Sequence, residues 1–581
     1  MKAALITLFF CLGCGLLHAQ LSVQQKVHDF SNLAAVYAKR YAPYEWKKLV
    51  VNFDLYELAP WLRRVERSRD DLEFFEICAE YVARLEDAHS SFRMPSSFSA
   101  DSGLFVDIYD GKVLIDSINR TLLPTARYPF QIGDELTTVD GRPVEQLLEE
   151  FSRLFRSGNP RTTRRMLADL LTFRPQSILP RAVELGDSVR FEIRRQSGAL
   201  ETYDVPWVKS GYPIRAVGPV PTPQVVPGRK SRLADTSEEP APEPAPEPAL
   251  EPTPEPTPEW MRPLEELWNF RVPHPEDHYV LGWGARNPIF QMPSNFVLRR
   301  GSAPTDWHFS GTYEAGGLRI GYLRFRNFAP PPTALAELDT EIAFFRQNTD
   351  GLVVDVMRNT GGGCYMAQAL QRLIPNRFTF LGEEIRVNLS YINSIYFALE
   401  SARRARADQW IIDLYSTILD QMVSAYTGNR GRTGPIPICS ISFEFDPVRD
   451  RAGDVIAYEK PLIVLIDEFS TSAGDMFPAS IQDNRRGPLV GWRTTGAGGS
   501  VSGWTSGIYS EASTSNTNSL VTRPGLIVTP DYPAAYYIEN IGVRPDVELD
   551  YMTRDNLLNR GRRFVEDFTG VIVSHVLDSR R

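Results

Sequence analysis

The stretch "PLIVLIDEFSTSAGDMFPASIQDN", residues 461–484, decides the fold of this chain. An unbroken apolar run leads into small hydroxyl residues and then a helix-like segment, the pattern of a buried strand that runs into a helix. Ser472 is expected near the start of that helix, where free N–H groups and the helix dipole favour negative charge. Two interpretations stay open from these residues alone. In the first, Ser472 is a nucleophile, and the N–H of Ala473 would bind the oxyanion that forms when it attacks a carbonyl. In the second, it is a helix-capping serine, a role for which Ser470 is an equal candidate.

Strand-like and helix-like segments alternate around this stretch. This alternation predicts an α/β core with a largely parallel sheet over residues 276–581, ending in a C-terminal helix. The run "GLVVDVMRNTGGG" (351–363) is read as a second buried strand that ends in a glycine-rich turn. A tight turn explains these glycines most simply. If the turn lies beside Ser472 across the sheet, however, the N–H groups of Gly361 and Gly362 can approach a ligand closely.

The rest of the chain divides by composition. Residues 20–100 read mostly helical, because "DDLEFFEICAEYVARLEDAHSSF" (70–92) repeats apolar residues at helical spacing and ends near His89. Residues 101–210 carry short alternating runs with Gly/Asp turns, which predict a β-rich module. Residues 211–275 hold "SEEPAPEPAPEPALEPTPEPTPEW", whose alternating Pro and Glu predict an extended spacer; a processing site is the alternative.

Composition and the N-terminus restrict the function classes. The formal net charge of −9 argues against nucleic acid as a partner. Residues 1–19 read as a signal peptide cut near Ala19, so we expect an exported (periplasmic or secreted) protein. A membrane anchor and a lipoprotein modified at Cys14 are weaker alternatives, and no later segment is apolar enough to span a membrane. Three cysteines remain after the signal, Cys78, Cys364 and Cys439, and they allow one disulfide at most.

A serine nucleophile needs a base, and His89 is the best placed of the seven histidines. It lies where a helix gives way to a loop, so its ring could point into a cleft. A neutral imidazole is the usual activator of serine, with a carboxylate that fixes its tautomer. Taken alone, His89 is better explained as a helix-capping or surface residue.

Several motifs occur in this order along the chain: "LEDAH", "IGDELTTVDGRPV", "IGYLRF", "DVMRNTGG", "STSAGD", "RTTGAGG" and "IENIGVRPDVEL". Their order resembles that of tail-specific (C-terminal processing) and tricorn-type serine peptidases, and of their chlamydial protease-like activity factor branch in particular. They span roughly residues 75 to 550. The resemblance implies a crotonase/ClpP-like α/β core, the N-terminal helical region and an inserted PDZ-like domain. Whether that domain captures peptides or is purely structural stays open.

One departure from the family pattern bears on the mechanism. C-terminal processing peptidases carry a general-base lysine where this chain has Ala497, so the resemblance implies the Ser-His-Glu arrangement of the tricorn-type and chlamydial members. Carried over by position, Ser472 is the nucleophile, His89 the base and Glu539 the carboxylate that orients it. The serine that assists the glutamate in tricorn-type members is Ala88 here.

The resulting expectation is an exported serine endopeptidase that works through an acyl-enzyme, with protein or peptide substrates. It would need no cofactor and no metal, since neither H-E-x-x-H nor a Cys/His cluster occurs. The family resemblance also leads us to expect that the chain can form a homodimer. The alternatives are a catalytically idle peptide- or ligand-binding protein on the same scaffold and a crotonase-like acyl-transfer enzyme. The signal peptide and the PDZ-like insertion disfavour the second alternative.

Overall fold

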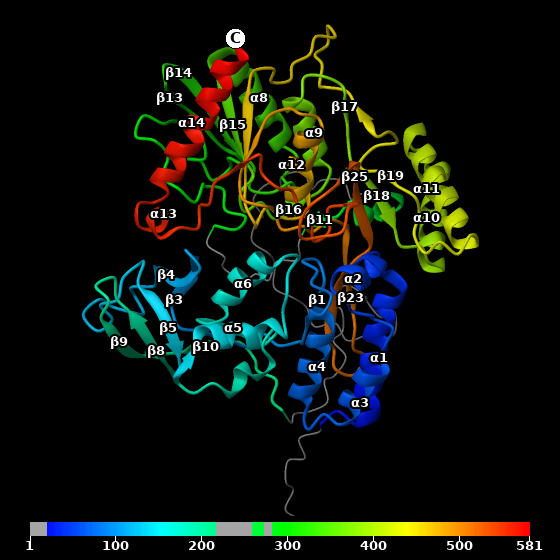
Figure 1. Cartoon of the computed structure of the whole chain (residues 1–581). Coiled ribbons are helices and arrows are strands. Elements are labelled where there is room, and N and C mark those ends of the chain that lie inside the picture. The colour runs from blue at the N-terminus through cyan, green and yellow to red at the C-terminus, as the bar shows by residue number, and fades with distance from the viewer. Residues whose placement is uncertain (1–19, 217–257, 272–281) are drawn as a thin grey trace, which may run out of the picture.

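The structure is a computed structural model that describes residues 20–216, 258–271 and 282–581 (Figure 1). The α/β core lies in the upper half of Figure 1, and the N-terminal helices and the β-rich module lie side by side beneath it. The predicted signal peptide and most of the predicted spacer lie outside the described residues.

A seven-stranded sheet forms the centre of the core, in the order β12-β13-β14-β15-β21-β22-β27. The strands from β14 to β27 run parallel, which confirms the predicted largely parallel sheet. All five residues of both β15 and β21 are buried, as expected for strands covered on both faces. The bounds are β12 (Val297–Arg300), β13 (Phe309–Ala315), β14 (Leu318–Arg324), β15 (Gly351–Asp355), β21 (Leu462–Ile466), β22 (Leu489–Gly491) and β27 (Val547–Glu548).

Helices cover the two faces of this sheet. Leu352, Val354 and Val464 pack in one cluster with α8, α9 and α12, whereas Val353 and Ile463 pack in another with α14. Neighbouring strand residues thus point to opposite faces, and each face buries its own set of helices. The helices are α8 (Ala334–Asn348), α9 (Tyr365–Leu373), α12 (Ala473–Asp483), α13 (Arg554–Leu558) and α14 (Arg562–Ser579).

The N-terminal region is helical, as predicted, but α4 is buried more completely than its pattern suggested. A single apolar face was expected, yet Phe74, Ile77 and Tyr81 are buried as well. The helix is enclosed because α1 and α3 lie on one side of it and η1 of the β-rich module lies on another. The elements are α1 (Val23–Arg40), α2 (Tyr44–Val50), α3 (Ala59–Glu66) and α4 (Asp71–Ala83).

Residues 104–206 form a six-stranded antiparallel sheet with two helices. Helix α6 packs against β3, where Arg165 forms a buried ion pair with Asp107 at 2.6 Å. Arg165 also lies 3.0 Å from Glu468 of the core, so α6 joins the two modules. The elements are β3 (Leu104–Tyr109), β4 (Lys112–Ile118), β5 (Glu135–Val139), β6 (Arg142–Pro143), α5 (Val144–Ser152), α6 (Pro160–Asp169), η1 (Pro180–Glu184), β8 (Ser188–Arg194) and β9 (Leu200–Pro206).

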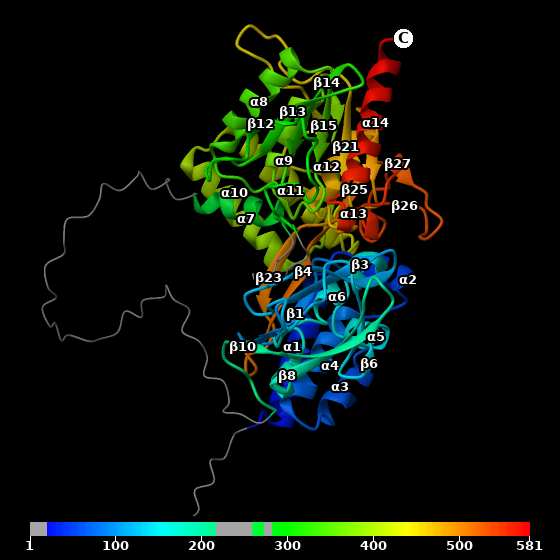
Figure 2. The same ribbon diagram turned by 90° about the vertical axis from the view of Figure 1, so that its left-hand side faces the viewer.

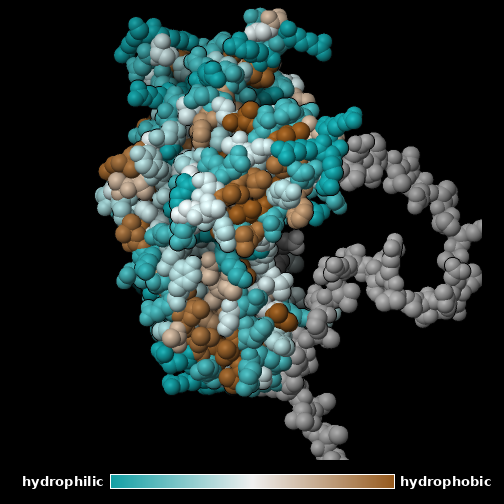
Figure 3. Space-filling model, turned by 90° about the vertical axis from the view of Figure 1, so that its right-hand side faces the viewer, coloured by the Kyte–Doolittle hydropathy of each residue, from teal (hydrophilic) through white to brown (hydrophobic). Residues whose placement is uncertain are grey.

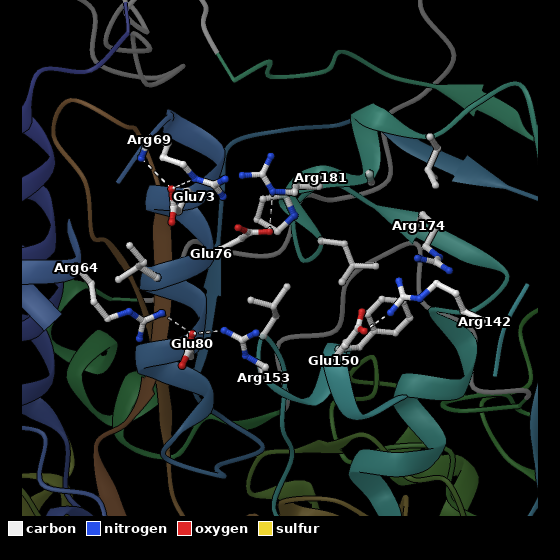
Figure 4. A pocket seen from close by; sticks show the side chains of 17 residues that line it. Arg64, Arg69, Glu73, Glu76, Glu80, Arg142, Glu150, Arg153, Arg174 and Arg181 are labelled. Carbon is white, nitrogen blue, oxygen red and sulfur yellow. Dashed lines mark hydrogen bonds and ion pairs between the residues drawn. The ribbon is translucent and has the colours of Figure 1, made fainter. Parts of the chain in front are cut away.

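A cleft of about 580 Å³ lies between α4 and the β-rich module (Figure 4). Arginine and glutamate side chains line it in pairs. Arg64 and Arg153 both contact Glu80, at 2.7 and 3.2 Å. Neither Ser472 nor His89 lines this cleft.

Short sheets tie the N-terminal region to the core. Strand β1, just after His89, pairs with β24 of the core through the register Ser91↔Ser515. In Figures 1 and 2, β23 descends from the core toward the N-terminal helices. These strands and the remaining short ones are β1 (Ser91–Arg93), β2 (Ser99–Asp101), β7 (Phe173–Pro175), β10 (Val208–Ser210), β17 (Phe378–Thr379), β18 (Gly382–Ile385), β19 (Ile436–Pro437), β20 (Glu444–Phe445), β23 (Val501–Thr505), β24 (Ser513–Thr517), β25 (Ser519–Ile527) and β26 (Ala535–Tyr537).

The C-terminal end of the predicted spacer is folded. Residues 259–271 form η2 (Glu259–Met261), α7 (Arg262–Leu267) and β11 (Phe270–Arg271). Leu264 and Leu267 are buried in a cluster with the helical hairpin of α10 (Leu389–Ala405) and α11 (Gln409–Thr427). Residues 259–271, which the composition assigned to the spacer, are therefore folded and packed against the core.

Figure 3 views the right-hand side of Figure 1, where α10 and α11 lie, and shows brown apolar patches among hydrophilic side chains. Phe397 and Val423 are among the exposed apolar residues of this hairpin. Within the described part of the chain, no helix combines the length and apolar character needed to cross a membrane.

Candidate active site

Ser472 lies at the N-cap of α12, directly after the turn that follows β21, as predicted. Its backbone has φ 63° and ψ −115°, a conformation that costs a non-glycine residue about 1–3 kcal/mol and is concentrated at functional sites. The buried Asp475 carboxylate stabilises this conformation by accepting the Ser472 N–H at 2.6 Å. Asp475 also accepts the N–H groups of Gly496 and Ala497, so one carboxylate holds the serine turn and the "TTGAGG" loop together.

His89 and Ser472 are in hydrogen-bonding contact, although 383 residues separate them. The distance from His89 Nε2 to Ser472 Oγ is 2.9 Å, and both side chains are fully buried. The backbone of His89 is fixed at two points: its N–H donates to Asp87 Oδ1 at 2.8 Å, and its carbonyl accepts the Ser515 hydroxyl at 2.7 Å. Pairing of β1 with β24 therefore brings the N-terminal region to the serine.

The electrostatics favour the neutral imidazole. Burial lowers the pKa of His89 to about 4, an effect that the Asp87 carboxylate opposes and the Lys47 ammonium reinforces. The ring is thus unprotonated near pH 7, the form that can accept a proton from a hydroxyl.

Glu539 lies in the same buried cluster but forms no hydrogen bond with the imidazole. Its Oε1 accepts from the Lys47 ammonium, and its Oε2 accepts the Gly498 N–H at 3.0 Å. Among the described residues, His89 Nδ1 has no hydrogen-bond partner. Burial raises the pKa of Glu539 to about 7, and the charge of Lys47 opposes this rise. The predicted orienting contact between Glu539 and His89 is therefore not formed in this arrangement.

The predicted oxyanion donors differ in their availability. Ala473 is the first residue of α12, a position whose N–H has no intrahelical partner. The N–H of Gly361 is engaged by Asn359 Oδ1 at 2.8 Å. Gly361 does lie against the serine, because a Cβ built on it would come within 2.9 Å of Ser472 Cβ.

A strand of the chain itself covers this turn. Strand β11 pairs antiparallel with β16 (Gly361–Gly362), and a Cβ on Gly361 would lie 2.2 Å from the Phe270 carbonyl oxygen. A groove of about 610 Å³ adjoins the pair, with Trp268, Phe328 and Gly362 among its lining residues. The Gly361–Gly362 strand can therefore pair with an extended backbone.

The three described cysteines form one disulfide, the maximum that their number allows. Cys364 forms a disulfide with Cys439, and Cys78 is a buried free thiol. Cys364 directly follows the Gly361–Gly363 turn and caps α9, so the crosslink anchors one end of the turn beside Ser472.

Three residues of the cluster were not identified from the sequence. Asp87 and Asp475 lie inside the quoted motifs and could have been singled out as carboxylates beside the base and the nucleophile. Lys47 lies on the seven-residue helix α2, which is too short to show a periodic pattern. Nothing in the local sequence predicts that its side chain is completely buried.

Two family models and several curated proteins match parts or most of the chain. Residues 319–549 match the model of peptidase family S41, and residues 103–213 match the PDZ domain. A protein of Chlamydia muridarum is 25% identical over 93% of this chain and 91% of its own length. A protein of Chlamydia pneumoniae is 23% identical over 97% of this chain and 92% of its own length.

Solved structures show the same fold. The crystal structure of mature CPAF superimposes with a TM-score of 0.70 at 20% identity, covering 96% of this chain and 98% of that one. Its complex with lactacystin gives a TM-score of 0.69, at 20% identity and 96% and 99% coverage. The match to peptidase family S41 over residues 319–549, behind the match to the PDZ domain, supports a serine peptidase.

Proposed function

We propose that the chain is an exported serine endopeptidase in which Ser472 is the nucleophile, His89 the general base and Glu539 the third member of the triad. The observation that carries this proposal is the 2.9 Å contact between His89 Nε2 and Ser472 Oγ. The strained backbone of Ser472 at the start of α12 supports it, because strain of this kind presents nucleophiles.

The reaction follows from the positions of these atoms. His89 Nε2 takes the hydroxyl proton as Ser472 Oγ attacks the peptide carbonyl, and the Ala473 N–H receives the developing oxyanion. The imidazolium then protonates the leaving amine, and water repeats the cycle on the acyl-enzyme. Since Gly361 donates to Asn359, Gly362 is the remaining predicted candidate for a second oxyanion donor.

A substrate would bind as an extended strand on the glycine turn. The pairing of β11 with β16 supports this mode, because it places an extended backbone beside Ser472. We propose that the substrate takes the place of β11 on this edge. A strand bound along its length does not require a chain end, which favours cleavage within a polypeptide.

Export rests on the signal-like residues 1–19. The Cys364–Cys439 disulfide supports it, since such bonds persist in oxidising compartments. Association into a homodimer stays a prediction that sedimentation of the purified protein would check.

The test is labelling with a fluorophosphonate probe. Wild type should be labelled, labelling should be lost in Ser472→Ala and His89→Ala, and Glu539→Gln should react more slowly. Ser480→Ala is the matched control, because this hydroxyl lies on the same helix and bonds only the Met476 carbonyl in the described structure. Retained labelling in folded Ser472→Ala contradicts the proposal. A folded wild type that never reacts favours the peptide-binding alternative.

A further inference from the structure

Lys47 is an unusual residue for a protein interior. Its side chain has no exposed area, and it comes from α2 of the N-terminal region. Its ammonium group has three N–H donors, and three oxygens accept from it: Glu539 Oε1, Asn540 Oδ1 at 2.7 Å and the Glu86 carbonyl at 2.9 Å. A buried ammonium is costly unless it is paired and fully hydrogen-bonded, so this geometry indicates a specific role.

These contacts fix the position of the Glu539 carboxylate. One oxygen is held by Lys47 and the other by the N–H of Gly498. Gly498 belongs to the same loop whose Gly496 and Ala497 amides bind Asp475, next to Ser472. Lys47 therefore sets the place of Glu539 relative to the nucleophile.

The same lysine also holds the turn that carries His89. Lys47 donates to the carbonyl of Glu86, three residues before His89, and Asn540 Nδ2 donates to that carbonyl at 2.8 Å. No hydrogen bond joins the Glu539 carboxylate directly to the His89 ring in this arrangement. Lys47 instead connects the carboxylate to the turn that carries His89 through its own hydrogen bonds. Lys47 is the one side chain that bonds Glu539, Asn540 and Glu86 in the described structure.

We propose that Lys47 is a positioning residue of the active site, which clamps the Glu539 carboxylate against the turn that carries His89. The inference rests on the proposed triad. Its chemical purpose is to keep an anion beside the imidazolium that forms when His89 accepts the Ser472 proton. It acts through Glu539 and touches neither substrate nor nucleophile.

The charges around Glu539 give the proposal a signature in pH. Burial raises the pKa of Glu539, and the Asp87 carboxylate, which precedes His89, raises it further. The Lys47 ammonium from α2 and the Gly498 N–H from the loop both lower it. Tyr41 also faces this cluster, and burial raises its pKa well above the usual value, so it stays neutral. Without Lys47, Glu539 would keep the Gly498 N–H but lose its neighbouring positive charge, and its pKa would rise above about 7.

The experiment compares Lys47→Met, Glu539→Gln and their double variant by the second-order rate of fluorophosphonate labelling from pH 6 to 10. Lys48→Met is the matched control, because that neighbouring lysine is 55% exposed and pairs with Asp54. Removing one adjacent charge moves a pKa by about one unit, which would lower the anionic fraction of Glu539 at pH 7 from about one half to about one eleventh. We therefore expect Lys47→Met to react about 5-fold more slowly at pH 7. Its acid limb should shift upward by about one unit, and its deficit should vanish toward pH 10.

The double variant separates positioning from general stability. If Lys47 acts through Glu539, Lys47→Met should slow Glu539→Gln by less than about threefold. The proposal would be overturned if Lys47→Met lowered the labelling rate equally at every pH, or if its effect on the rate multiplied with that of Glu539→Gln. A folded Lys47→Met with the wild-type rate and pH profile would also overturn it. If Lys47→Met does not fold, Lys47→Arg replaces it; its charge should leave the acid limb in place, and a one-unit shift would contradict the inference. Labelling retained in Ser472→Ala would instead refute the triad itself.

Discussion

Replacing Cys364 and Cys439 by alanine opens a crosslink between residues separated by 75 positions in the sequence. In the chain-entropy account, closing a loop of that length in the unfolded state is worth about 4.5 kcal/mol, and measured values commonly reach about 2–4 kcal/mol. We expect the double variant to lose about 3 kcal/mol of unfolding free energy. Both cysteines are only half-buried, so the replacement adds little cavity cost of its own.

The assay is urea unfolding followed by tryptophan fluorescence, without reductant, on wild type and Cys364→Ala/Cys439→Ala. Wild type treated with a phosphine reductant should unfold like the variant, and the variant itself should not respond to reductant. A loss below about 1 kcal/mol would refute the reasoning, because it would mean that the loop is already constrained in the unfolded chain. Cys78→Ala is the control for reductant effects outside the disulfide.

Three further changes have defined outcomes. Asp87→Asn should slow fluorophosphonate labelling at least about 10-fold, because burial lowers the pKa of the His89 imidazole and this change removes the carboxylate that opposes that effect; a wild-type rate would contradict this. The labelling rate of wild type should fall as pH drops through about 7, the pKa to which burial raises Glu539, since the carboxylate is needed as an anion; a flat profile down to pH 5 would show that this ionisation does not matter. Arg165→Met removes a positive charge beside the buried carboxylates of Asp107 and Glu468 and should lower the free energy of unfolding in urea by about 3–5 kcal/mol. A loss below about 1 kcal/mol would mean that α6 does not depend on this arginine.

The sequence predicted those features that local patterns encode. The strand β21, the helix α12 and the position of Ser472 between them follow from an apolar run, small hydroxyl residues and a helical segment in immediate succession. Strand β15, the neighbour of β21 in the sheet, could be predicted in the same way, because strands buried on both faces are apolar throughout.

Features that depend on long-range contacts were not predictable in the same way. The burial of Lys47 depends on Glu539, 492 residues away, and the helix that carries it is too short for a periodic signal. Residues 259–271 look like the end of a Pro/Glu-rich spacer, and only the packing of Leu264 and Leu267 against α10 and α11 shows that they are part of the core. The contact of Glu539 was expected at the imidazole and lies instead at Lys47, because a motif fixes which residue is present and not which neighbour it pairs with.

The most direct measurement of the central claim is the isolation of an acyl-enzyme. Purified protein is mixed with a p-nitrophenyl ester of a short peptide, quenched in acid within the burst phase and mapped by mass spectrometry after digestion. The account predicts one acyl group per chain on Ser472, in the peptide that contains residues 470–475, and no such adduct in His89→Ala over the same interval. Acylation of another residue, or turnover of the ester without any adduct on Ser472, would contradict it.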